Sequence, residues 1–131
     1  MNPANLVALA LIAAALALHS VAYSQHSHSH AHKPLHGGVV VEASDVDFEL
    51  VAKADVVTLY VRDHGKPIDL KGASGKIVLL SGTDKVEAAL APVEGNALQA
   101  KGAFKVTPGT KAVSTVTLPG KKPITARFVI K

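Results

Sequence analysis

Hydrophobic and polar side chains alternate along much of the chain that follows residue 36. The clearest run is the last one, in which every second residue is apolar: Ile124, Ala126, Phe128 and Ile130. They alternate with Thr125, Arg127, Val129 and Lys131. The same period of two recurs over 46–53, 57–62 and 86–90. Because successive side chains of a strand point to opposite faces, this pattern predicts half-buried β-strands.

Short turn signals that contain glycine separate these runs, and glycine accepts the positive φ that tight hairpin turns need. The runs between the turns predict strands near 39–44, 46–53, 56–62, 76–81, 85–91, 97–104, 111–118 and 123–130. No stretch after residue 24 keeps a 3.6-residue period for three helical turns. We therefore predict that residues 36–131 form an all-β domain. The expected architecture is an antiparallel two-sheet sandwich of immunoglobulin-like type with seven to nine strands, and an open barrel is the alternative.

The N-terminus has a different pattern, an unbroken apolar run of 13 residues from Leu6 to Leu18. A membrane-spanning helix needs roughly 20 apolar residues, whereas the hydrophobic part of a signal peptide needs about 7–15. Small residues allow cleavage after Ala22 or after Ser24, and the sequence does not choose between them. We therefore predict that residues 1–24 are a signal peptide, that the mature protein is periplasmic, and that it has no membrane span. An uncleaved anchor is the alternative.

Composition excludes several classes of function. Without cysteine there is no disulfide, thiolate metal site or cysteine nucleophile. The net charge of +4 comes from dispersed lysines rather than from a basic run with aromatic residues, so a nucleic-acid partner is not expected. No nucleophile elbow or phosphate loop is present, and we predict that the protein is not an enzyme. Asp45, Asp47 and Glu49 are expected to be solvated carboxylates on the outer face of a strand.

A histidine-rich tract, QHSHSHAHK, occupies residues 25–33. It has no apolar face with which to pack, so residues 25–35 are predicted to be a flexible segment ahead of the domain. In an extended chain, histidines two residues apart point to the same side at roughly 6.5–7 Å intervals. Imidazole binds divalent copper, zinc, nickel or cobalt, and the mature chain has no sulfur to favour Cu(I). The predicted metal ligands are His26, His28, His30, His32 and, at the mouth of the first strand, His36.

Four short runs carry a resemblance to a known family. They are Leu35-His36-Gly37-Gly38-Val39-Val40, Asp47-Phe48-Glu49-Leu50-Val51, the strand and turn over 59–68, and the run over 91–98. Over residues 35–131 the chain resembles a small β-rich domain that stands, usually after a His-rich stretch, at the front of some periplasmic adaptor subunits of heavy-metal efflux pumps of the resistance-nodulation-division class. The resemblance implies a periplasmic sandwich-like domain associated with zinc, cobalt, cadmium, nickel or copper homeostasis. The chain lacks the helical hairpin and lipoyl-like domain of a whole adaptor.

These observations predict an exported periplasmic protein that binds a divalent transition metal through its His-rich tail, in metal homeostasis or heavy-metal resistance. The alternative is a non-catalytic protein-interaction module of an envelope or efflux complex, with the histidine tract as a linker. The interaction-module hypothesis predicts a stable protein partner and only incidental metal binding.

Overall fold

The computed structural model describes residues 32–131, so the predicted signal peptide and His26, His28 and His30 lie outside the described residues. The described part contains nine strands. They are β1 (Val39–Ala43), β2 (Val46–Ala52), β3 (Val56–Asp63), β4 (Lys66–Pro67), β5 (Ser74–Ser81), β6 (Asp84–Val93), β7 (Ala97–Lys101), β8 (Lys111–Thr117) and β9 (Ile124–Val129). It contains no helix of the length and apolarity that a membrane crossing requires.

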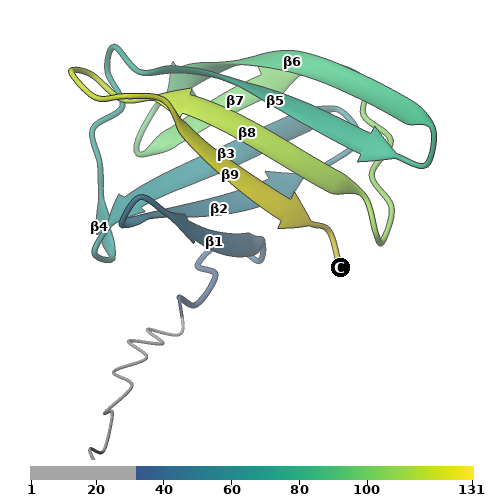
Figure 1. The fold of residues 1–131 in the computed structure, drawn as a ribbon, viewed down its shortest axis with the longest axis horizontal. Helices are drawn as coiled ribbons and strands as arrows, with labels where there is room; N and C mark the ends of the chain where they lie inside the picture. Colours follow the sequence, from purple (N-terminus) through teal and green to yellow (C-terminus); the bar gives the residue numbers. More distant parts are fainter. Residues whose placement is uncertain (1–31) are drawn as a thin grey trace, which may run out of the picture.

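All the strand pairs are antiparallel, in the order β1-β2-β3-β7-β6-β5-β8-β9, and the short β4 pairs with β3 (Figure 1). Strand β6 joins two sheets, because its first part pairs with β5 and residues 91–93 pair with β7. Strands β1 and β9 lie close together, although no ladder joins them in the described part of the chain. The sheet is therefore nearly closed and barrel-like. The prediction of an all-β antiparallel domain with seven to nine strands is confirmed.

The core consists mainly of the apolar positions that alternate along the strands, with a few residues from the connections such as Leu70. Its largest fully buried apolar side chains are Phe48, Leu50, Leu59, Leu70, Ile77 and Leu98. The predicted strand positions agree with the structure to within a few residues, except that β4 was not predicted. Burial of alternate apolar residues is what removes most of the apolar surface from water, so the local period of two is enough to locate these strands.

Strand β2 is buried on both faces. Val46, Phe48 and Leu50 face the core, whereas Asp47 and Glu49 lie on the outer face of the sheet. Residues 32–38, called the arm below, fold back over this outer face and contact both carboxylates. The expectation that Asp47 and Glu49 are solvated was therefore wrong: their exposed fractions are 4% and 0%.

Candidate metal-binding site

The outer face of β1, β2 and β3 carries two adjacent rows of side chains beneath the arm. In the first row, ladder pairing places Glu42 opposite Asp47 and Asp47 opposite Arg62. In the second row, Glu49 lies opposite Tyr60. Because Asp47 and Glu49 are two residues apart on β2, their side chains leave the same face roughly 6.5–7 Å apart along the strand. Two carboxylates of one strand therefore lie side by side under the arm.

The fully buried carboxylate of Glu49 holds the arm on the sheet. The N–H groups of Leu35, His36 and Gly38 donate to its oxygens at 3.0, 2.7 and 3.1 Å. The His36 ring adds a fourth bond from Nδ1 to Oε2 at 3.0 Å. An ionised carboxylate only accepts hydrogen bonds, so Nδ1 is the donor and a neutral His36 ring keeps its lone pair on Nε2. Glu49 is thus the point on which the polar contacts of the arm converge.

Tyr60 and Arg62, both on β3, complete the surroundings of Glu49. The His36 ring stacks on the Tyr60 ring, with 3.5 Å between centroids and 2° between planes. Arg62 Nη2 lies 3.6 Å from Glu49 Oε2 and donates to the Lys33 carbonyl oxygen at 3.4 Å. Arg62 is buried, and its Nε has no hydrogen-bond partner within the described part of the chain. The arm therefore contacts β3 as well as β2.

Burial and hydrogen bonding act in opposite directions on the pKa of Glu49. Burial raises the pKa of this carboxyl, whereas the hydrogen bonds from the His36 ring and from the N–H groups of His36, Leu35 and Gly38 together lower it by more. The net pKa is lowered from the ordinary value of 4.5. Glu49 is therefore an anion at neutral pH, which is the form that four donors require.

This lowered pKa predicts how the stability of the domain changes in acid. A carboxyl with a lower pKa in the folded than in the unfolded protein stabilises the fold above the unfolded value, and the contribution disappears as pH falls through the folded value. We expect Glu49→Gln to lose the part of the acid dependence that lies below pH 4.5. Urea unfolding of the parent and the variant, over about pH 3 to 6, measures the two slopes. Identical slopes below pH 4.5 would contradict this assignment.

Gly38 lets the arm approach β2 closely. A Cβ atom at this position would clash with the Leu50 carbonyl oxygen and would lie 2.9 Å from its carbonyl carbon. Gly37 has a positive φ of 74°, a conformation that side chains other than glycine rarely adopt. The Gly37-Gly38 pair therefore determines the path by which the arm reaches the outer face.

A cluster of three potential ligands lies at the start of the arm. His32 Nδ1 is 2.7 Å from Asp47 Oδ2, and His32 Nε2 is 2.7 Å from Glu42 Oε2. One ligand atom from each residue lies within 4.8 Å of the other two. The Asp47 side chain is 6% exposed, and its second oxygen, Oδ1, is buried without a hydrogen-bond partner in residues 32–131. The Glu42 side chain is 45% exposed and is the accessible side of the cluster.

The β1–β2 hairpin positions both carboxylates. Its two-residue turn, Ser44 and Asp45, has positive φ at both positions, 51° and 62°. Such a turn is of the type that matches the twist of the strands and fixes their register, and the register here pairs Glu42 with Asp47. Ser44-Asp45 is not one of the usual Asn-Gly or Asp-Gly pairs of this turn, so the turn residues gave little signal that the two carboxylates lie opposite each other.

The distances in the cluster are those of hydrogen bonds. Ligand atoms bound to one tetrahedral zinc ion, at about 2.0–2.2 Å each, lie roughly 3.3 Å apart. A proton, rather than an ion, therefore fits between His32 Nε2 and Glu42 Oε2 at their present separation of 2.7 Å. Replacing that proton by a divalent cation requires an outward shift of Glu42 by less than about 1 Å. Asp47, hydrogen-bonded to Nδ1, would then orient the imidazole as outer-shell carboxylates do in zinc sites.

The structure separates the predicted ligands into groups. His32 lies in the cluster with two carboxylates, whereas His36 lies on Glu49 and Tyr60. His64, expected in a loop, lies in the turn before β4 and pairs with its neighbour Asp63. Glu42 and Asp47 were not predicted as ligands.

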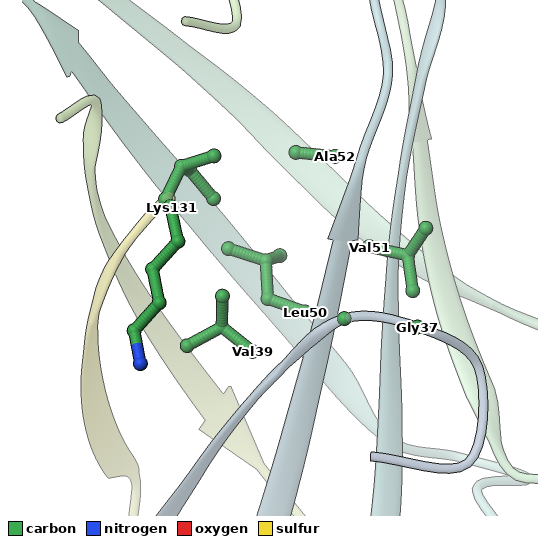
Figure 2. Close-up of a pocket in the computed structure, with 8 residues that line it drawn as sticks. Gly37, Val39, Leu50, Val51, Ala52 and Lys131 are labelled. Carbon is green, nitrogen blue, oxygen red and sulfur yellow. The ribbon is translucent and has the colours of Figure 1, made fainter. Parts of the chain in front are cut away.

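A separate pocket lies between the β1–β2 hairpin and the residues after β9, and Gly37 and Gly38 also line it. Figure 2 shows Val39, Leu50 and Lys131 among the side chains that line it. Its lining is mostly apolar, and it contains none of the three residues of the cluster. The pocket is therefore separate from the candidate metal site.

No protein-family model, curated protein or solved structure matches this chain. The resemblance to efflux adaptor domains therefore stays a prediction. The proposed function rests on the residues beneath the arm.

Proposed function

We propose that this protein binds a divalent transition-metal ion where the His-rich segment meets the β domain, and that His32, Glu42 and Asp47 are the part of the site supplied by the described residues. The observation that carries the proposal is the position of His32: its imidazole lies between two carboxylates of the β1–β2 hairpin, one of them buried. Buried carboxylates are costly unless they are paired with a cation or coordinate a metal.

The donor set suits a borderline divalent ion. His32 Nε2 and the Glu42 carboxylate are ligands for Zn(II), Co(II), Ni(II) or Cu(II), with Asp47 holding the imidazole through Nδ1, and the cluster offers no sulfur. Two direct protein ligands leave at least two coordination positions open. In this proposal His26, His28 and His30 fill such positions, because they precede His32 at every second residue. His36 has Nδ1 bound to Glu49, so only its Nε2 is available to an ion.

The location and the cellular role follow from the sequence alone. The apolar N-terminal run supports export to the periplasm, and the resemblance to efflux adaptor domains supports a role in metal homeostasis or resistance. The alternative, an interaction module of an envelope or efflux complex, predicts metal binding that does not depend on His32, Glu42 or Asp47.

Substitution of the two carboxylates tests the proposal. We expect Asp47→Asn to weaken Zn²⁺ binding by about 10–100-fold, the range seen when an outer-shell partner of a metal ligand is lost, and Glu42→Gln to weaken it by a similar factor. Competition with a chromophoric chelator at neutral pH measures the affinities. The matched control is Glu87→Gln, an exposed carboxylate on β6. Unchanged affinity in both cluster variants would refute the site.

A further inference from the structure

We infer that Glu49, which contacts no member of the cluster, is a positioning residue of the metal site, and that metal binding and docking of the arm are one coupled equilibrium. This inference rests on the proposed function, since it concerns how the same site is assembled. It differs from that function because it assigns a role in metal affinity to a residue outside the ligand set.

The arm has little apolar contact with the sheet. Residues 33–37 are exposed, and Leu35, its one large apolar side chain, is 65% exposed. An exposed segment without a buried apolar face has to offset its ordering entropy by other contacts. In the described part of the chain, these include the hydrogen bonds to Glu49, the Arg62 contact with the Lys33 carbonyl and the stacking of the His36 ring on Tyr60, in addition to the contacts of His32 itself.

The same arm carries His32 to the cluster. Glu42 and Asp47 belong to the β1–β2 hairpin, and their positions follow from its ladder. His32 has no ladder position, and it reaches them because Leu35, His36 and Gly38 are bound to Glu49. When the arm leaves the sheet, the imidazole leaves both carboxylates, and the cluster of three residues no longer exists.

Thermodynamic linkage sets how much the metal affinity falls when docking of the arm is weakened. If an ion binds the cluster only when the arm is docked, the apparent dissociation constant equals the intrinsic one divided by the docked fraction. A variant in which the docked fraction falls to about one tenth binds about tenfold more weakly. By reciprocity, an ion that joins His32 on the arm to Glu42 and Asp47 on the sheet raises the docked population by the same coupling.

The experiment uses the protein as exported and Zn²⁺ alone as the probe. Glu49→Gln removes the negative charge that accepts the hydrogen bonds of the arm N–H groups. Gly38→Ala leaves every charge in place but displaces the arm, because the added Cβ clashes with the Leu50 carbonyl. Glu87→Gln is the matched control on β6. We expect Zn²⁺ binding to be about tenfold weaker in both arm variants and unchanged in the control. Circular dichroism confirms that each variant is folded.

Hydrogen exchange of the Leu35, His36 and Gly38 amides distinguishes a positioning role of Glu49 from a general effect on the fold. These amides should exchange faster in Glu49→Gln without metal, and saturating Zn²⁺ should restore their protection. In the parent protein Zn²⁺ should slow the same amides further. Each of these changes should be confined to the arm.

The outcomes separate the two proposals. If Asp47→Asn weakens Zn²⁺ binding but Glu49→Gln and Gly38→Ala do not, the coupling is wrong and the site stands. If Asp47→Asn binds as the parent does, the site itself is wrong and the coupling falls with it. Protected arm amides in metal-free Glu49→Gln would also overturn the coupling, because Glu49 would then not hold the arm.

Discussion

Replacing Arg62 by methionine should lower the free energy of unfolding by about 3–5 kcal/mol, the usual cost of breaking a buried charge arrangement by removing one partner. Arg62 is 5% exposed, lies opposite Asp47 in the ladder and is 3.6 Å from the Glu49 carboxylate. Methionine keeps the apolar stem but leaves two buried carboxylates on one strand without the guanidinium. The remaining anions repel each other in a poorly solvated site.

The chain has a matched control in Arg127, which is exposed on β9. Arg127→Met should change stability by no more than about 0.5 kcal/mol, as is usual for surface substitutions. Urea unfolding at neutral pH compares the two variants. The difference in the free energy of unfolding between Arg62→Met and the parent should become smaller in acid, because protonation of a carboxylate removes the repulsion. Equal stability of Arg62→Met and Arg127→Met would mean that the buried carboxylates do not need this cation.

Replacing His32 by alanine should weaken Zn²⁺ binding by at least about 100-fold, the upper end of the effects of outer-shell changes, because a direct ligand is lost. His32 is the cluster's single imidazole and the residue that joins the arm to both hairpin carboxylates. The loss should exceed that of either carboxylate variant. Competition titration with a chromophoric chelator measures the loss of affinity.

His64→Ala is the control for this substitution. His64 is also an imidazole beside a carboxylate, that of Asp63, but its side chain is 80% exposed in the turn before β4. We expect its removal to leave Zn²⁺ affinity unchanged. If His32→Ala and His64→Ala behave alike, metal binding resides in residues other than the cluster.

Most of the fold could be predicted from local pattern. In β9, alternate residues such as Ile124, Ala126 and Phe128 are buried and their neighbours are exposed, so the period of two by itself identifies the strand. Turns with glycine then divide the strands. The pairing order could not be predicted in this way, because the neighbours of β3, for example, are β2 and β7, which are far apart in sequence.

The candidate site could be predicted only in part. His32 was predicted as a ligand from its place in the histidine tract. Asp47 and Glu49 have the alternation of a solvent-exposed face, and what buries them is a segment that precedes β1 and has no apolar pattern of its own. Contacts of this kind depend on backbone N–H groups, which every residue has, and so leave no trace in residue type apart from the Gly37-Gly38 pair.

The structure connects the tract to the domain through carboxylate–imidazole pairs. His32 is held by Asp47 and His36 by Glu49, and both carboxylates come from the outer face of β2. A His-rich segment attached only by a flexible joint would bind metal without reference to the domain. Here the last histidine of the tract lies against the sheet, so an ion bound by the tract would be brought to a defined surface.

The most direct test of this account is the imidazole ¹⁵N spectrum of the protein during titration with Zn²⁺. We predict that the His32 Nε2 signal moves to the position of a metal-bound nitrogen at one equivalent, while Nδ1 stays protonated against Asp47. If the His32 nitrogens keep their metal-free signals while other histidines take up the ion, the site beneath the arm does not bind metal and the central claim is wrong.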